Sequence, residues 1–337
     1  MKISNRCFIS EAMMLRAVVV LALIILPPGW VKAGQLVEVS GCRQPAEILC
    51  LADGAGKSGA SHALLVDKQA QRLLVYAGGQ DRIRLVGAYP CSTGKARGAK
   101  QRSGDRKTPE GVYFFVKKYL KKDLAPIYGS MAFPLDYPNR LDRLAGRSGY
   151  AIWLHGTNKA LKPRDSNGCI VVENSTIGNL ASVIRLNRTP IIITARAEYR
   201  PVGWNDADLQ EIRALVEKWC RHLARGSYLQ YSGLFADNRA PSMRWWSQWC
   251  SLRRIPGDGH MRVCVTASGL EVYRQGDVFC VTFDQVLDYR GRSLPAGRRK
   301  FFLRKQAGIM RIVTESYLGR PAGKDRLFSA IKEIGNG

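Results

Sequence analysis

Two short motifs with a histidine and a cysteine fourteen residues apart organise this sequence. They read Ile152-Trp-Leu-His-Gly-Thr157 and Ser166-Asn-Gly-Cys-Ile-Val-Val-Glu-Asn174. His155 ends one apolar run and Cys169 begins the next, so we expect them to meet across neighbouring strands, joined by residues 157–168. A nearby imidazole lowers the pKa of a thiol and takes its proton. The pair predicts a nucleophile and its general base, although a single cysteine is more often a small packed apolar residue.

The backbone around the pair supports the same chemistry. Gly168 lets the main chain approach closely, so we expect the N–H groups of Gly168 and Cys169 to hold a developing oxyanion. Gly156 directly after His155 predicts that a main-chain carbonyl, not a carboxylate, orients the imidazole ring. This chemistry requires neither a metal nor a cofactor.

Short β-branched or aromatic runs separated by turn residues surround the two motifs. Strands are predicted at 63–67, 73–76, 83–89, 112–116, 150–154, 169–172 and 190–194, the first three in an antiparallel sheet. Residues 91–107 form a glycine-rich loop with many Lys and Arg residues, which is more often functional than decorative at this length. Residues 117–149 read as a flap beside the site with one short helix. The apolar residues after Asn174 have helical spacing, so we expect a helix there with Asn174 or Ser175 as its N-cap.

The second half has a different pattern after a linker predicted at 196–204. A helix beginning near Asn205 has apolar residues at the 3.6-residue period. These are Leu209, Ile212, Leu215, Val216, Trp219 and Leu223. A second helix is expected over 243–252, followed by strands at 262–268, 277–286, 299–305 and 309–317. Helices followed by an antiparallel sheet predict a separate α+β domain.

The N-terminus and the charge predict an exported protein. Basic residues, the apolar run Ala17 to Leu26 and a small-residue exit at Ala33 predict a signal peptide over 1–33, followed over 34–61 by a linker or an irregular lead-in strand. The net charge of +25 implies an anionic partner. Export to the periplasm or cell wall argues against nucleic acid as the anionic partner. It favours a protein that is peripherally associated with an anionic envelope. The start codon stays open, because Met13 and Met14 also precede the apolar run.

Nine cysteines leave the disulfide pattern open. Cys42 with Cys50 is a plausible local bridge in an oxidising compartment, whereas the sequence does not choose among Cys220, Cys250, Cys264 and Cys280. Each is equally explained as a small buried residue.

Residues 62–195 resemble the YkuD-type L,D-transpeptidase catalytic domain, whose motif runs from His-Gly to Ser-x-Gly-Cys. The matching upstream segments are Ser92-Thr-Gly94 and Gly104-Asp-Arg-Lys-Thr-Pro-Glu-Gly111. Asn167 stands where many members have histidine, and Val171 stands where many have Arg or Asn. The Tyr137-Pro-Asn139 segment points to the YafK-like branch. The resemblance implies a mainly β catalytic domain, a sandwich or barrel with short helices.

The resemblance also implies acyl transfer on peptidoglycan stem peptides. Cys169 forms a thioester with a tetrapeptide stem, His155 acts as base and then acid, and an amine resolves the thioester. The further site residues implied are Gly156, Ser166, Gly168 and Asn167, with Thr157, Lys107, Tyr137 and Asn139 binding the substrate. Alternatives are hydrolysis of an amide linked to diaminopimelate, an envelope protein as acceptor, and a wall-binding protein with no activity.

Residues 205–325 resemble the nuclear-transport-factor-like (SnoaL-like) cone fold. The resemblance rests on the Trp219 helix, the Trp245-Trp246 pair and the strands that follow them. Asp284 and Glu315 are candidates for a pocket in such a cone. The alternative is a supporting domain for wall binding or for a homo-oligomer.

Overall fold

The computed structural model describes residues 43–52, 61–78, 83–237, 239–253, 263–289 and 292–319, all within one compact unit. The predicted signal peptide over 1–33 and Cys42 of the suggested bridge lie outside the described residues. Within these ranges, no helix is long and apolar enough to cross a membrane.

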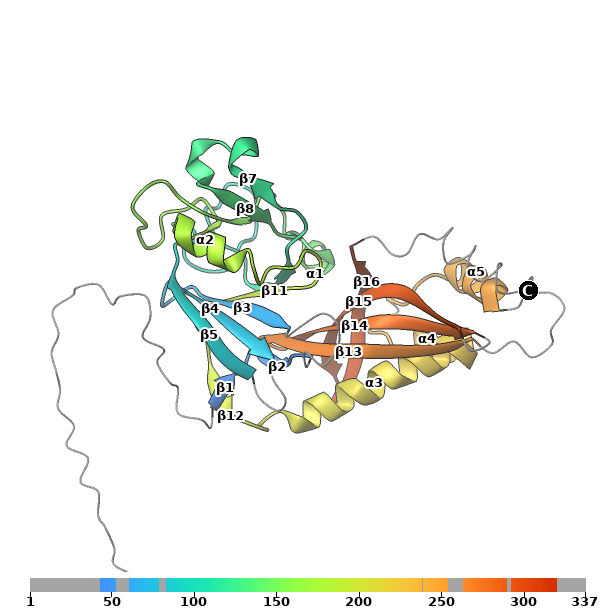
Figure 1. Ribbon diagram of the computed structural model, residues 1–337. Coiled ribbons are helices and arrows are strands. Elements are labelled where there is room, and N and C mark those ends of the chain that lie inside the picture. The colour runs from blue at the N-terminus through green and yellow to red at the C-terminus, as the bar shows by residue number, and fades with distance from the viewer. Residues whose placement is uncertain are drawn as a thin grey trace, which may run out of the picture. The chain divides into compact units, whose positions relative to one another are not determined.

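The first half of the chain is built on a five-stranded sheet in the order β5-β4-β3-β11-β6 (Figure 1). Its strands are β3 (His62–Asp67), β4 (Arg72–Gly78), β5 (Ile83–Pro90), β6 (Gly111–Phe114) and β11 (Pro190–Thr194). The predicted antiparallel run of β3, β4 and β5 is confirmed, and β11 lies between β3, to which it runs parallel, and the edge strand β6, to which it runs antiparallel. The central strands read as continuous apolar runs because side chains on both faces are buried.

A second, four-stranded sheet in the order β10-β9-β8-β7 carries the two motifs. It consists of β7 (Tyr119–Leu120), β8 (Met131–Pro134), β9 (Trp153–His155) and β10 (Ile170–Val171). The 3₁₀-helices η1 (Lys121–Asp123) and η2 (Pro126–Tyr128) lie between β7 and β8 in the predicted flap. The single short helix expected there is α1 (Arg140–Leu144), and the helix expected after Cys169 is α2 (Asn174–Leu180).

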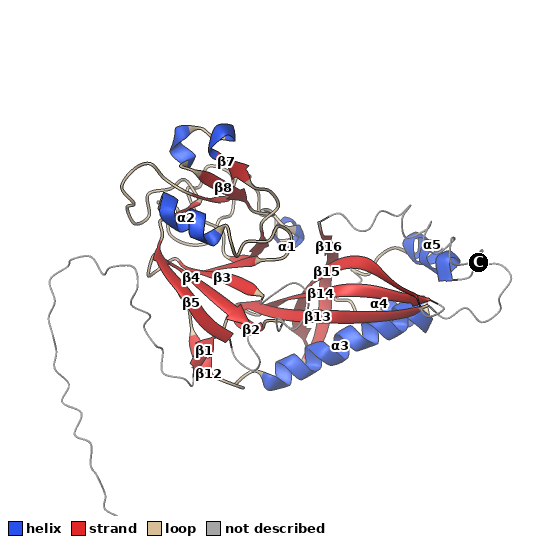
Figure 2. Ribbon diagram, in the orientation of Figure 1, coloured by secondary structure: helices blue, strands red, loops and turns tan. Residues whose placement is uncertain are grey.

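The second half begins with helices and ends with an antiparallel sheet, as expected (Figure 2). The helices are α3 (Asp206–Arg225), α4 (Tyr228–Ser232) and α5 (Met243–Arg253). The strands are β13 (Cys264–Gln275), β14 (Val278–Tyr289), β15 (Arg292–Gln306) and β16 (Ile309–Leu318). The mainly β fold class of the chain is confirmed, whereas the resemblance of this half to the cone fold stays a prediction.

Both segments expected as linkers contain strands. β1 (Arg43–Pro45), from the predicted 34–61 linker, pairs antiparallel with β12 (Tyr199–Pro201), from the predicted 196–204 linker. β2 (Ile48–Cys50) then joins the edge of the second half's sheet beside β13. Strands of three residues show too little periodicity to be recognised, and here they form by pairing with partners far away in the sequence.

The helix α3 lies along the second half's sheet and buries the face that its apolar period predicted (Figure 1). Trp219 is fully buried at its centre, with edge-to-face contacts to Phe283 and Phe301 at ring distances of 5.7 and 5.2 Å. Its indole N–H donates to the buried Glu315 carboxylate at 3.0 Å. Trp219 therefore joins helix and sheet by both packing and a hydrogen bond.

We expect Trp219→Ala to lower the free energy of unfolding by about 3–5 kcal/mol, because it leaves a large cavity and removes a donor from a buried carboxylate. Urea denaturation measures the change. Leu229→Ala on α4, where the side chain is 80% exposed, is the control and should change the free energy by less than about 0.5 kcal/mol. A loss below about 1 kcal/mol for Trp219→Ala would contradict this account of the core.

Candidate active site

His155 and Cys169 come together at the ends of two neighbouring strands. β9 and β10 run parallel with Val171 opposite His155 and Ile170 opposite Leu154. Because side chains alternate between the faces of a sheet, Cys169 and Val171 project to one face together with His155. Both residues line a cavity of 320 Å³, which confirms that they meet across neighbouring strands. Its other lining residues from the two motifs are Thr157, Ser166, Asn167 and Val171.

The His155 ring is buried and held by the main chain. Its Nδ1 lies 2.7 Å from the carbonyl oxygen of Gly156, which agrees with the prediction of a main-chain carbonyl partner. A carbonyl only accepts, so Nδ1 carries the proton and Nε2 is left as an acceptor. Tyr128 of the flap packs edge-on against the ring at 5.1 Å. Burial lowers the pKa of His155, and the Gly156 hydrogen bond raises it by less. The imidazole is therefore neutral at neutral pH.

The Cys169 thiol is protonated in the resting protein. Burial raises its pKa to about 11, and a hydrogen bond with the main chain of Trp153 opposes this rise by less. Its Sγ lies 3.4 Å from the carbonyl oxygen of Ala151, which accepts the thiol proton. A thiol with a raised pKa beside an imidazole with a lowered pKa does not form an ion pair at rest. A nucleophilic attack by this thiol would therefore require the transfer of its proton during the attack.

The turn before Cys169 is closed by the Ser166 hydroxyl. Its Oγ accepts from the Gly168 N–H at 3.0 Å and donates to the Cys169 carbonyl at 2.7 Å. This bond corrects the expectation that the Gly168 N–H faces an oxyanion. Gly168 has φ of +130°, and an added Cβ would lie 2.9 Å from the Lys107 carbonyl oxygen. Gly168 is therefore required for the close approach of two chain segments.

Three of the four expected substrate-binding side chains lie away from the cavity. Tyr137 is buried, and its hydroxyl donates to the Ser148 carbonyl at 2.9 Å. Asn139 caps α1, because its Oδ1 accepts from two main-chain N–H groups of that helix. Lys107 contributes its carbonyl beneath Gly168 and is absent from the residues that line the cavity. The prediction for these side chains was wrong because it assumed that a residue within a motif also points its side chain into the cavity. A motif fixes the position of a residue in the chain but not the direction of its side chain. Thr157, the fourth, does line the cavity.

Asn174 joins the flap to the His155 turn instead of capping α2. The N-cap is Glu173, so the expected cap at Asn174 or Ser175 was wrong. The Asn174 Oδ1 accepts from the Ser130 N–H at 2.8 Å, and its Nδ2 donates to Asn158 Oδ1 at 2.8 Å. A Cβ on either Gly129 or Gly156 would collide with this side chain. Asn174 therefore fixes the flap, the His155 turn and the following loop relative to one another.

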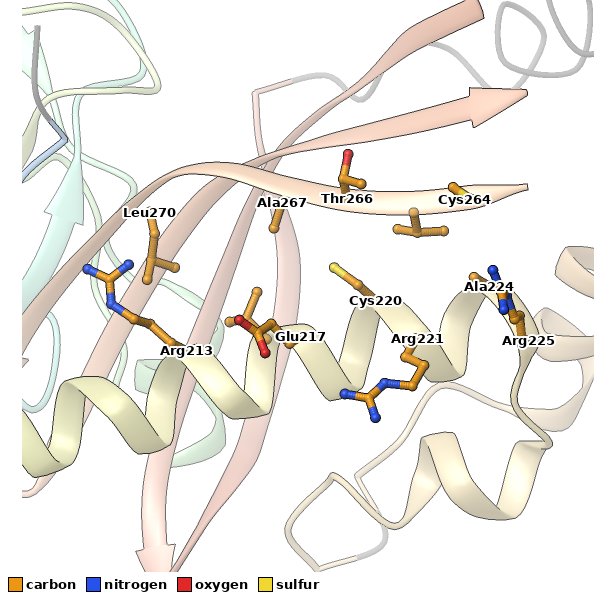
Figure 3. Close-up of a pocket in the computed structure, with 12 residues that line it drawn as sticks. Arg213, Glu217, Cys220, Arg221, Ala224, Arg225, Cys264, Thr266, Ala267 and Leu270 are labelled. Carbon is orange, nitrogen blue, oxygen red and sulfur yellow. The ribbon is translucent and has the colours of Figure 1, made fainter. Parts of the chain in front are cut away.

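A larger cavity of 610 Å³ lies between α3 and β13 in the second half (Figure 3). Arg213, Arg221 and Arg225 of α3 line it on one side, and Thr266, Ala267 and Leu270 of β13 line it on the other. It contains neither of the residues expected in a pocket there. Asp284 is paired with Arg188 and Arg298, and Glu315 is buried with Trp219 and Tyr231. Of these two cavities, only the smaller one is lined by His155 and Cys169.

Several residues of the Cys169 cavity were not singled out from the sequence. They are Ile127, Tyr128, Lys159, Ala160, Leu161, Lys162 and Asp165. The predicted flap supplies Ile127 and Tyr128, and the predicted basic loop contributes Lys95. Position in the flap was a signal for the first two. The lysines between the motifs had no signal beyond being polar residues of a connecting loop.

Comparisons with known proteins agree with this geometry. Residues 61–193 match the family model of the YkuD L,D-transpeptidase catalytic domain. YafK of Escherichia coli (strain K12) is 30% identical over 114 residues, which are 34% of this chain and 43% of YafK. The chain thus spans less than half the length of that relative.

Two solved structures resemble the chain beyond its catalytic domain. Bd1075 of Bdellovibrio bacteriovorus is 25% identical with a TM-score of 0.67, covering 84% of this chain and 99% of that structure. The helical cell shape determining protein Pgp2 of Campylobacter jejuni is 20% identical with a TM-score of 0.60, covering 80% of this chain and 94% of that structure. Residues 61–193 of this chain are therefore a YkuD-type L,D-transpeptidase catalytic domain.

Proposed function

We propose that the protein is a peptidoglycan L,D-transpeptidase that works through a thioester on Cys169. The observation that carries the proposal is the pairing of His155 and Cys169 on one face of two parallel strands, in one cavity, with His155 Nε2 left as an acceptor. The family of the domain supports the choice of substrate. The N-terminal export pattern and the charge of +25 support an envelope location, and the likeness to Pgp2 suggests a role in cell shape.

In the first step, His155 Nε2 takes the proton of the Cys169 thiol as Sγ attacks the carbonyl carbon of the L-centre residue in a tetrapeptide stem. The Cys169 N–H and the Asn167 side-chain amide are the donors we assign to the oxyanion, since the Gly168 N–H is bound to Ser166. The C–N bond then breaks, and His155 returns the proton to the leaving D-alanine amine. The stem remains as a thioester on Cys169.

In the second step, an amine of another stem attacks the thioester carbonyl. His155 takes the proton of the amine, the C–S bond breaks and the thiol is restored. Water in place of the amine would give hydrolysis, and an amine of an envelope protein would attach that protein to the wall. The acceptor therefore decides between the transpeptidase and the hydrolase that the sequence left open.

The reaction is tested by incubating the purified protein with disaccharide-tetrapeptide and separating the products by mass spectrometry. We expect one D-alanine released per acyl transfer and dimers joined through the L-centre residue. Release of D-alanine with tripeptide monomers alone would assign hydrolysis. If wild-type protein released no D-alanine from soluble stems or from sacculi, the enzymatic proposal would fail and a wall-binding protein would remain.

Asn174→Leu should lower kcat about tenfold with a smaller change in KM, because the flap and the loop that follows His155 lose a common hydrogen-bonding partner, Asn174. The measurement is the steady-state rate of D-alanine release. Asn179→Leu, an exposed position on the same helix, is the matched control and should leave both constants unchanged. An unchanged kcat for Asn174→Leu would show that these contacts do not position His155.

A further inference from the structure

The Cys169 cavity has a cationic wall. Lys95, Lys159 and Lys162 line it, and Asp165 is the one acidic residue among its lining side chains. Lys95 is already paired with Asp165, at 3.5 Å between Nζ and Oδ1. Lys159 and Lys162 are exposed, and no carboxylate in the described part of the chain lies within ion-pair distance of them. Two lysines with no ion-pair partner in the described part of the chain therefore line the same cavity as Cys169.

The loop that carries these two lysines is held at both ends. Before them, the Asn158 side chain donates to the Pro126 carbonyl at 2.9 Å and accepts from Asn174 at 2.8 Å. After them, the Arg164 N–H donates to Gln71 Oε1 at 2.8 Å and the Asp165 N–H donates to Ser92 Oγ at 2.9 Å. Only residues 159–163 lie between these anchors. The main chain that carries the two lysines is thus held at the cavity before a ligand arrives, which reduces the backbone entropy lost on binding.

Ammonium groups at the mouth of a small cavity select an anion. The free carboxylates of a peptide stem are the anions nearest to the scissile bond, and a residue spans only about 3.5 Å along an extended chain. A carboxylate on the leaving residue, or on the side chain of the residue that is attacked, therefore falls within reach of a lysine at the cavity wall. This step rests on the proposed function, because it takes a peptide stem as the substrate.

We propose that Lys159 and Lys162 form a subsite for a free carboxylate of the peptide stem next to the scissile bond. The subsite makes the enzyme specific for stems that carry an unmodified acid there. Stems in which this acid has been converted to an amide lack the negative charge that the two lysines bind. The two lysines are specificity-determining residues, and they take no part in proton transfer.

The test uses three stems: the free tetrapeptide, the same stem with an amide on its terminal D-residue, and the stem with an amide on the side-chain carboxylate of the attacked residue. Binding is measured by calorimetry to Cys169→Ala protein, which holds the stem without turning it over, with and without Lys159→Gln/Lys162→Gln. For the free tetrapeptide, we expect the lysine substitutions to raise Kd about tenfold. For the stem that lacks the recognised carboxylate, Kd should already be raised and should not change further. Which amide removes the effect identifies the carboxylate.

Lys121→Gln/Lys122→Gln is the matched control, because it removes the same charge from exposed flap residues that do not line the cavity. An equal loss in this control would assign the effect to the overall charge and overturn the subsite. The subsite would also be overturned if the Lys159→Gln/Lys162→Gln substitutions weakened all three stems alike. In active protein, kcat/KM should follow the same pattern. A wild-type protein that binds the stems through these lysines but releases no D-alanine would contradict the proposed reaction and keep the subsite.

Discussion

Cys169→Ala is expected to lower the rate of D-alanine release by about 10⁴-fold or more, because it removes the atom that becomes acylated. The fold should be retained, since the Ser166 hydroxyl still closes the turn through the main chain of residues 168 and 169. Cys169→Ser should also lose most of the activity. A hydroxyl ionises far less readily than a thiol, and His155, neutral in this buried site, is a weak base for it.

The matched control is Cys264→Ala, which removes an exposed thiol of the second half. It should leave the rate unchanged. Circular dichroism and thermal unfolding of each variant separate lost chemistry from lost structure. A Cys169→Ala protein that kept more than a few per cent of the wild-type rate would rule out covalent catalysis by this residue.

His155→Gln is expected to lower kcat/KM by about 10³-fold, within the range of a lost general base. In the wild-type protein, the rate should fall as the pH falls through the pKa of His155, because the protonated ring cannot accept the thiol proton. Burial lowers this pKa, so the fall should lie below pH 6.5, the usual value of the group. At neutral pH, the base is already in its active form.

The rate of the variant should also rise with pH, but over a much higher pH range. Without the imidazole, only the fraction of Cys169 that ionises by itself can react. Because the thiol pKa is about 11, the residual rate should rise about tenfold per pH unit up to that value. The rate of D-alanine release between pH 5 and pH 11 checks both curves. An acid limb that persisted unchanged in His155→Gln would assign the base to another residue.

The sequence predicted most strands and helices because their signals are local. The apolar period of α3 and the β-branched runs around residues 64 and 192 each bury the faces that they indicated. β1, β2 and β12 were missed because such short strands depend on distant partners. The sequence of a three-residue segment does not indicate the distant strand with which it pairs, because that pairing depends on the tertiary fold.

The candidate site shows the same division. His155 and Cys169 were found because the chemistry needs those two residue types and the strand pattern places them side by side. The substrate-binding roles predicted for Tyr137 and Asn139 were wrong because the polar group of each side chain is hydrogen-bonded to the main chain. The Tyr137 hydroxyl donates to the Ser148 carbonyl, and the Asn139 side chain caps α1. Lys159 and Lys162 were missed because exposed lysines in a loop ordinarily face solvent, and only the folded chain shows which cavity they border.

The most direct test of the account is mass spectrometry of the protein quenched in acid during its first turnover of a tetrapeptide stem without an acceptor. We predict that the protein gains the mass of the stem minus D-alanine, that the peptide containing Cys169 carries this mass, and that hydroxylamine removes it as expected of a thioester. Release of D-alanine in the first turnover with no adduct on Cys169, or with the adduct on another residue, would contradict the account.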